Sequence, residues 1–318
     1  MQILMYSYND WGGANNLLAN YINHNTEHNA RSITEEAHPF GYDTDIVLGE
    51  ASSDEALEIK GLVKSADFFV LGQIYQTSFT KVLFEKISHN NCIIFYGGSD
   101  VRPIANKLFE TYDQDKHMYS FARDDFTMIR CLPRASHHNV YMIDTDRWKP
   151  SKKKYDKSDP IKIFHSPTNQ IIKGTSYIRE AIEILSEKHN VEWSHTGTTP
   201  SGEGGIPWAE SMLKKADADI YIDQLIIGAI GQNAAEAMAF GIPTMCYLSN
   251  HYMSMYPDTP IINTSPRTIL HDLEVLISDH KKRAEIGTQT RKYCVDLYGV
   301  HNSAWRWIHM IEFIAKEK

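Results

Sequence analysis

The sequence predicts an α/β protein with two domains, each built on a parallel, doubly wound sheet. Short apolar runs alternate with segments in which apolar residues recur at three- and four-residue spacings. Strand patterns that alternate with helix patterns are typical of parallel sheets covered by helices. The alternation starts afresh after residue 160, and a chain of 318 residues fits two domains of roughly 150 residues each.

The first half begins with an apolar run that we expect to be a central strand. A tight turn, Gly12-Gly13-Ala14, follows it, and glycine suits the unusual backbone angles of such turns. Strands are expected at 3–6, 45–48, 68–71, 92–96 and 140–143, and helices at 16–22, 55–63 and 80–87.

The second half repeats this scheme and ends in a helical tail. Strands are expected at 161–165, 191–195, 220–222 and 245–248, and helices at 175–185, 208–215, 233–240, 268–277, 281–297 and 300–317. We therefore expect an N-terminal domain over 1–148, a second domain over 149–300 and a terminal helix over 301–318. A hollow between two such domains is a natural place for a ligand.

Composition argues against several classes of protein. The net charge of −8 argues against a nucleic-acid partner. No apolar stretch approaches the roughly 20 residues of a membrane span, and the N-terminus does not resemble a signal peptide. Four scattered cysteines without a CxxC pair indicate a reducing cytosol. The basic segment 147–157 is interpreted as a solvated linker, with a patch for acidic lipid or a polyanionic acceptor as the alternative.

The most informative segment is 217–248, which contains a strand, a glycine-containing loop, a helix of small residues and a second strand. In parallel sheets, a loop that opens a helix just beyond a strand is where phosphorylated ligands bind. The helix carries one acid, Glu236, whose carboxylate suits a ribose diol. A buried crossover helix with one satisfied glutamate is the alternative.

The run from Glu236 to Pro243, Glu-Ala-Met-Ala-Phe-Gly-Ile-Pro, resembles the nucleotide-sugar signature of GT-B glycosyltransferases of the retaining family-4 type. The resemblance implies two Rossmann-like domains facing across a cleft. The first would be the acceptor side and the second the donor side, and the C-terminal helix would pack back on the first. It also implies that Glu236 holds the donor ribose. Gly228 stands where the family has a glutamate near the donor sugar, and Asp223 and Gln224 are the nearest polar substitutes.

The segment 164–175 resembles the donor-phosphate motif of the same family. Lys173 and Gly174 match the motif, and helix-start amides together with an ammonium group make an anion site. The family's arginine is absent. A surface lysine at a helix start is the alternative. The resemblance assigns donor binding here to Ser166, Thr168, Asn169, Lys173 and Gly174, and downstream to Ile230, Gly231, Gln232 and Asn233.

Two elements of the first half complete the expected site. Gly12 and Gly13 occupy the loop that the family uses for close approach of its substrates. The segment 95–103 resembles the family's His-Gly-Ser-Asp-x-Arg motif, which gives Asp100 and Arg102 a place beside Lys173 among the catalytic candidates. A helix cap at Ser99 or Asp100 is the alternative. The boundary segment 140–150 also resembles the interdomain passage of this family.

No metal site is expected. Asp144-Thr-Asp146 and Asp217-Ala-Asp219 spell the DxD motif of a different glycosyltransferase fold. The first lies in the apparent linker, and the second precedes a strand instead of ending one.

These observations predict a metal-independent glycosyltransferase that moves a sugar from a UDP- or GDP-linked donor to an acceptor hydroxyl, with retention. No cofactor is expected beyond the nucleotide-sugar substrate. The acceptor stays open among a saccharide, a lipid-linked sugar, a protein and a modified nucleobase. We expect a cytoplasmic monomer or homodimer, at most peripheral at the inner membrane face. A nucleotide-sugar epimerase and a non-catalytic GT-B-like binding protein are the alternatives.

Overall fold

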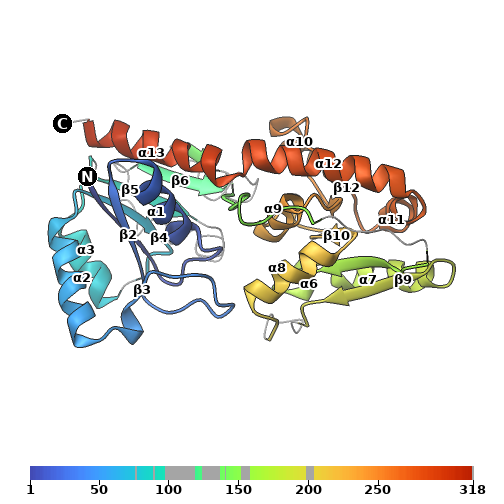
Figure 1. The fold of residues 1–318 in the computed structure, drawn as a ribbon, viewed down its shortest axis with the longest axis horizontal. Coiled ribbons are helices and arrows are strands. Elements are labelled where there is room, and N and C mark those ends of the chain that lie inside the picture. The colour runs from blue at the N-terminus through green and yellow to red at the C-terminus, as the bar shows by residue number, and fades with distance from the viewer. Residues whose placement is uncertain are drawn as a thin grey trace. The chain divides into compact units, whose positions relative to one another are not determined.

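The protein divides into two compact units, each holding one sheet (Figure 1). The computed structural model describes residues 1–75, 77–88, 90–96, 119–123, 137–139, 141–151, 158–197 and 204–316. The first unit contains residues 1–142 and 300–318, and the second contains residues 143–299. The chain therefore passes between the units twice. The α/β fold with two doubly wound parallel sheets, predicted from the alternation of apolar patterns, is confirmed.

In the described part of the first unit, seven parallel strands form a sheet in the order β3-β2-β1-β4-β5-β6-β7. Their bounds are β1 (Gln2–Ser7), β2 (Asn29–Thr34), β3 (Ile46–Val47), β4 (Phe68–Gly72), β5 (Cys92–Tyr96), β6 (Tyr119–Arg123) and β7 (His137–Asn139). The chain adds strands to one side of β1 and then, from β4, to its other side. The carboxyl ends of β1 and β4 therefore form a topological switch point, where open α/β sheets bind ligands.

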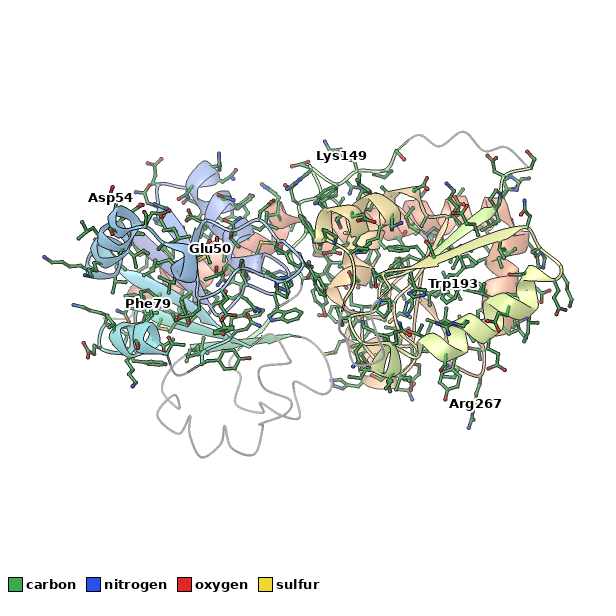
Figure 2. All side chains as sticks on the ribbon, turned by 90° about the horizontal axis from the view of Figure 1, so that it is seen from below. Glu50, Asp54, Phe79, Lys149, Trp193 and Arg267 are labelled. Carbon is green, nitrogen blue, oxygen red and sulfur yellow. The ribbon has the colours of Figure 1, made fainter. Side chains whose placement is uncertain are left out.

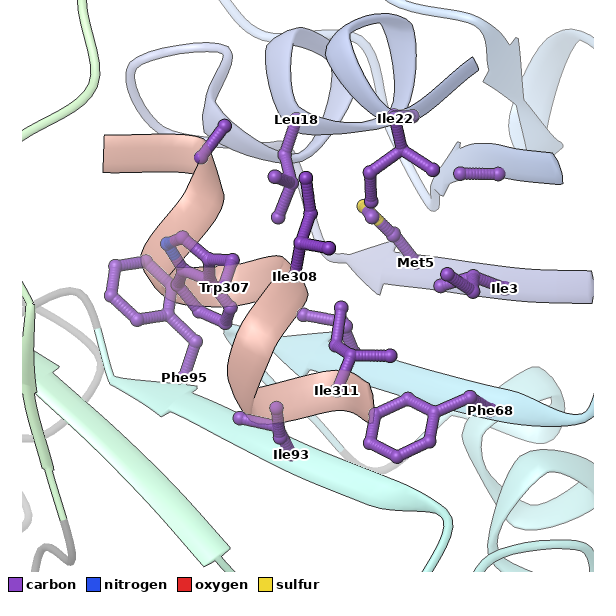
Figure 3. Close-up of a cluster of buried hydrophobic side chains, with 14 of the residues drawn as sticks. Ile3, Met5, Leu18, Ile22, Phe68, Ile93, Phe95, Trp307, Ile308 and Ile311 are labelled. Carbon is purple, nitrogen blue, oxygen red and sulfur yellow. The ribbon is translucent and has the colours of Figure 1, made fainter. Parts of the chain in front are cut away.

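Successive residues of β1 point to opposite faces of this sheet. Ile3 and Met5 enter a core shared with α1 (Ala14–Asn25) and α13 (Val300–Lys316), as Figure 3 shows. Leu4 and Tyr6 enter a second core with α2 (Ser53–Ser65) and α3 (Ser78–Phe84). A 3-10 turn, η1 (Leu48–Glu50), precedes α2. The last helix of the chain thus covers one face of the first sheet.

Five parallel strands among the described residues of the second unit form a sheet in the order β12-β11-β10-β8-β9. Their bounds are β8 (Ile161–His165), β9 (Val191–His195), β10 (Ile220–Ile222), β11 (Thr244–Cys246) and β12 (Ile262–Asn263). Its helices are α6 (Gln170–Lys173), α7 (Thr175–Ser186), α8 (Trp208–Asp217), α9 (Gln232–Ala239), α10 (Asn250–Met255), α11 (Ile269–Ser278) and α12 (His280–Leu297). Here the switch point lies between β8 and β10.

Two cores enclose this second sheet. Ile163 and Ile220 pack with α7 and α11 on one face. Phe164 and Tyr221 pack with α8 and α9 on the other. Alanines of α9 are fully buried, which brings that helix close to the sheet.

The strand expected at 140–143 is not found over its described residues, 141–143. Met142 is buried in the core of the first unit, whereas Ile143 forms only an isolated bridge with Gly299 in the second. The apolar run therefore reflects burial where the chain changes units. Several short strands were not expected from the sequence, namely β2, β6, β7 and β12.

Candidate functional site

The switch point of the second sheet carries a buried ion pair. Lys173, at the end of α6, places its Nζ 2.8 Å from Oδ1 of Asp223, which follows β10. The side chain of Asp223 is fully buried, and that of Lys173 is 11% exposed. The other carboxylate oxygen, Oδ2, accepts a 2.7 Å hydrogen bond from the backbone N–H of Gly231, just after the buried Ile230. Asp223 thus orients both the ammonium group and the loop before α9.

Local geometry explains why the chain places Lys173 here. Asn169 caps the single turn of α6 by accepting a 3.0 Å hydrogen bond from the N–H of Ile172. Gly174 has φ +74°, a conformation that favours glycine. A Cβ at this position would lie 3.3 Å from Leu225 and Ile226. The Lys173–Gly174 step therefore fits closely against the loop that follows β10.

His165 clamps the end of β8 to its neighbours. Its Nδ1 lies 2.8 Å from the carbonyl oxygen of Ile222 and its Nε2 lies 2.8 Å from Oγ1 of Thr175. A carbonyl only accepts, so Nδ1 donates and Nε2 accepts from the threonine hydroxyl. Burial lowers the pKa of His165 to about 4, so the ring is neutral at pH 7. The sequence analysis did not single out His165, although a histidine that ends an apolar strand is a recognisable signal.

Glu236 lies on α9 with both carboxylate oxygens bonded. Oε1 accepts a 3.0 Å hydrogen bond from Nε1 of Trp208, and Oε2 lies 2.7 Å from Nζ of Lys215. Lys215 is fully buried and also donates to Ser211 and Asn233, at 3.0 and 2.8 Å. All three N–H bonds of its ammonium group therefore have acceptors. Sequence reasoning missed Lys215 and Trp208, because both come from α8, a different element.

The side chain of Gln224 forms hydrogen bonds with nearby backbone groups. Its Nε2 donates to the carbonyl oxygens of Ala229 and Tyr247, both at 2.8 Å. Its Oε1 accepts from the N–H groups of Ile226 and Ile227, at 2.7 and 2.6 Å. The side chain is fully buried. Gln224 therefore fixes the shape of the loop between β10 and α9.

Gly228 cannot simply be replaced by the glutamate that the resemblance expects. Its φ is +87°, which is strained for any other residue. A Cβ would also lie 3.2 Å from the Cβ of Ser249. The loop thus has a shape that requires glycine at this position.

The other candidates of the second unit lie around the same edge. Ser166 is buried, with its hydroxyl 2.6 Å from that of Tyr221, and its carbonyl oxygen accepts from Nδ2 of Asn233 at 3.0 Å. Thr168 is exposed, whereas Gln232 and Asn233 are half-buried at the start of α9. Gly231 supplies no side chain to cap this helix. The structure thus brings Lys173, Asp223 and the start of α9 together.

The first-half candidates divide into two groups. Gly12 and Gly13 lie in the turn before α1, with φ values of +83° and +62°. A Cβ on Gly13 would approach the ring of Tyr42 to 3.3 Å, so this glycine allows the ring to pack there. Asp100 and Arg102 lie outside the described residues.

Both DxD sequences have structural partners. Lys162 pairs with Asp217 through Nζ at 2.7 Å, and its backbone N–H donates to Asp219 at 2.9 Å. Asp144 accepts from the backbone of Arg147 within a turn. Within the described ranges, no three His, Cys, Asp or Glu side chains gather as a metal site would require.

No helix in the described part of the chain has the length and apolar character needed to cross a membrane.

Comparison with known proteins shows which solved structures have a similar fold. No protein-family model and no curated protein sequence matches the chain significantly. A glycosyltransferase from Rickettsia africae ESF-5 superposes with a TM-score of 0.65 at 10% identity, with 99% of each chain covered. Sucrose-phosphate synthase from Thermosynechococcus elongatus gives a TM-score of 0.64 at 10% identity, with 98% of each chain covered.

A third solved structure, HepE from Anabaena in complex with UDP-glucose, has a TM-score of 0.60 at 12% identity. It covers 98% of this chain and 99% of its own. Such identities concern the fold alone. The protein has the two-domain α/β fold of GT-B glycosyltransferases, as the sequence motifs predicted.

Proposed function

We propose that the protein is a glycosyltransferase that moves a sugar from a UDP- or GDP-linked donor to an acceptor hydroxyl, with retention and without an obligatory metal. The observation that carries the proposal is the arrangement of Lys173, Asp223 and Gly231 at the switch point of the second sheet. The second unit would be the donor side and the first unit the acceptor side. The GT-B fold and the UDP-glucose held by a protein of similar fold support this assignment.

The diphosphate would bind between Lys173 and the start of α9. The ammonium group of Lys173 has three N–H bonds, one of which points to Asp223. The helix N-terminus adds backbone N–H groups and the positive end of the helix dipole. Gln232 and Asn233 provide the first of these amides. A doubly charged leaving group therefore meets a cation and a dipole of matching sign.

The ribose would bind to Glu236. Each carboxylate oxygen has two lone pairs, so the bonds to Lys215 and Trp208 leave acceptor capacity. The side chain of Glu236 is 2% exposed, so a diol would reach it only after a local rearrangement. Lys215 would keep the carboxylate in place during this exchange.

Transfer would proceed on one face of the sugar. The bond from the anomeric carbon to the β-phosphate oxygen breaks as the acceptor oxygen bonds to the same carbon. The acceptor proton passes to the departing phosphate oxygen. Asp223 has both oxygens engaged inside the protein, so no nucleophilic role is assigned to it. Lys173 would stabilise the leaving group, and Asp100 and Arg102 stay first-half catalytic candidates.

A panel of UDP- and GDP-sugars tests this proposal. We expect thermal stabilisation by one nucleotide class and slow hydrolysis of its sugar donors. Stabilisation without hydrolysis or transfer would favour a non-catalytic binding protein, for which Gly228 in place of the glutamate is the supporting observation. Conversion of one donor sugar into its epimer would favour an epimerase. The absence of both stabilisation and turnover with every donor would reject the transferase proposal.

A further inference from the structure

Three buried polar atoms near the carboxyl edge of the first sheet have no hydrogen-bond partner among the described residues. They are Oδ1 of Asn9, Nδ2 of Asn15 and Nε2 of His38. Asn15 is 5% exposed and His38 is 3% exposed. Buried polar groups nearly always find a partner, so this grouping indicates that a water or a ligand belongs here.

The backbone at this edge is held in an unusual conformation. Asp10 follows β1 and Gln73 follows β4, and both have positive φ values, +42° and +44°. The carboxylate of Asp10 accepts from the N–H groups of Asn15 and Asn16, at 3.0 and 3.1 Å, and so fixes the start of α1. Non-glycine residues in this conformation cluster at ligand sites. β1 and β4 also define the switch point, so position and conformation agree.

His38 offers a hydrogen-bond donor. The backbone N–H of Phe40 donates to Nδ1 of His38 at 3.0 Å, so Nδ1 is the acceptor and the neutral ring carries its proton on Nε2. Burial lowers the pKa of His38 to about 4, which keeps the ring neutral at pH 7. The rings of Trp11 and Tyr42 lie nearly perpendicular to it, at centroid distances of 4.6 and 4.7 Å. These neighbours offer the N–H at most a weak contact with a ring face.

The charges of this region disfavour an anionic ligand. Residues 1–59 include ten acids, and their only Lys or Arg is Arg31. Arg31 is already bonded to Asp45 and Glu58, at 2.7 and 2.6 Å. Of the acids, Glu36 and Asp43 flank His38 in sequence and are exposed, and Figure 2 labels two more, Glu50 and Asp54. The acids of this segment therefore favour a neutral ligand over a phosphate or a nucleic acid.

The remaining features suit a saccharide. Unpartnered donors and an unpartnered acceptor together match hydroxyl groups, which both donate and accept. Trp11 is 44% exposed and Tyr75 is 43% exposed, and such rings present flat apolar faces to a sugar ring.

We propose that the first unit binds a neutral saccharide at this edge. Asn9, Asn15 and His38 would hydrogen-bond its hydroxyls, and Trp11 would pack against its ring. The inference rests on the proposed transferase function and narrows the acceptor to a neutral saccharide, in place of a protein or a modified nucleobase.

Fluorine NMR of the full chain labelled with 5-fluorotryptophan tests the proposal. The Trp11 resonance is assigned with Trp11→Phe. The probes are methyl α-glucoside, maltose, cellobiose and chitobiose, with glucose 1-phosphate and glucuronate as anionic counterparts. We expect at least one neutral probe to shift the Trp11 resonance in a saturable way, at concentrations where the anionic probes do not.

His38→Phe keeps an aromatic ring but removes the N–H, and we expect it to weaken saccharide binding about three- to tenfold. His24→Phe, on the exposed face of α1, is the matched control and should change nothing. If His38→Phe does not fold, Trp11→Leu at an exposed position takes its place. Calorimetric saccharide binding should then fall at least threefold, and unchanged affinity would reject the site.

UDP and GDP binding to the same samples separates this proposal from the proposed function. Nucleotide binding without a Trp11 shift from any neutral probe would overturn the saccharide site alone. A shift with the anionic probes only, or equal affinity in His38→Phe, would also overturn it. Failure of both nucleotides to bind would instead reject the proposed function, whatever the saccharides do.

Discussion

The carboxyl edges of the two sheets occupy equivalent places in the topology but are chemically different. In the second unit, two lysines are buried against carboxylates, Lys173 with Asp223 and Lys215 with Glu236. In the first unit, neutral side-chain atoms of Asn9, Asn15 and His38 have no hydrogen-bond partner among the described residues. This difference is the basis for our proposals of a charged ligand at one edge and a neutral ligand at the other.

The free-energy cost of burying these groups also differs between the two edges. Burying an ion pair costs desolvation of both charges, which the attraction between them only roughly offsets. Two such pairs beside α9 thus contribute little net stability, and their value lies in holding charge in place. An unpartnered neutral atom costs less to bury than an unpaired ion and regains a partner when a ligand binds.

The largest expected effect comes from breaking the fully buried pair of the second unit. Lys215→Met would leave Glu236 buried without its cation, and we expect the free energy of unfolding to fall by about 3–5 kcal/mol. Urea unfolding measures it. Lys292→Met is the matched control, because Lys292 pairs with Asp296 at the surface, where both side chains are more than half exposed. Equal unfolding curves for the two variants would show that the buried pair has no special role.

The two edge histidines should respond to acid in the same direction. Burial lowers the pKa of His165 from 6.5 to about 4, so the unfolded chain takes up a proton below pH 6.5 while the folded chain does not until about pH 4. This contribution to stability, of the order of 3 kcal/mol, is complete above pH 6.5 and is lost as pH falls to 4.

Replacing His165 by Gln should therefore flatten the rise in urea midpoint between pH 4 and 6.5. His38→Gln should flatten it as well, since its pKa is also lowered to about 4. If the urea midpoint rises as steeply with pH in both variants as in the natural protein, the two rings are not buried in their neutral form.

Nucleotide affinity tests the charged edge itself. Lys173→Met should weaken binding of UDP or GDP by about 10- to 100-fold, because a charge-assisted contact to phosphate is lost. Lys162→Met removes an exposed lysine paired with Asp217 and should leave the affinity unchanged. Calorimetric titration compares the two. A similar loss in both variants would indicate a general charge effect instead of a site.

The smallest expected effect is steric. Gly231→Ala would place a Cβ 2.9 Å from Nζ of Lys173 and 3.2 Å from Oδ2 of Asp223. The pair must shift, and we expect about a tenfold loss of nucleotide affinity, equivalent to about 1.4 kcal/mol. Gly61→Ala on α2 is the control, since nothing lies within 4 Å of its added Cβ. Unchanged nucleotide affinity in Gly231→Ala would mean that the pair does not contact phosphate.

Much of the fold could be predicted from the sequence, because buried central strands are continuous apolar runs. β4 and β5 were expected within a residue at either end. β2 was missed because its residues Asn29 and Arg31 break the apolar run, and Arg31 is satisfied by Asp45, which is distant in sequence. The strand expected at 140–143 failed for the opposite reason, since burial there comes from two different units.

The candidate site was predictable only in part. Lys173 and Glu236 were found through local motifs. The sequence did not predict which residues these two side chains pair with, because ion pairing depends on which loops and helices tertiary packing brings together. Lys215 resembles an ordinary helix lysine in sequence, yet it is fully buried. Asp223 was proposed from the sequence as a polar substitute near the donor sugar, and its bonds to Lys173 and Gly231 could not be predicted.

The most direct test of the central claim is a calorimetric titration of the full chain with UDP and with GDP. If the edge between β8 and β10 is built for a nucleoside diphosphate, one of the two should bind with one-to-one stoichiometry. The affinity of that nucleotide should fall as added salt screens the phosphate contacts. A folded protein that binds neither nucleotide at any concentration tested would contradict the account.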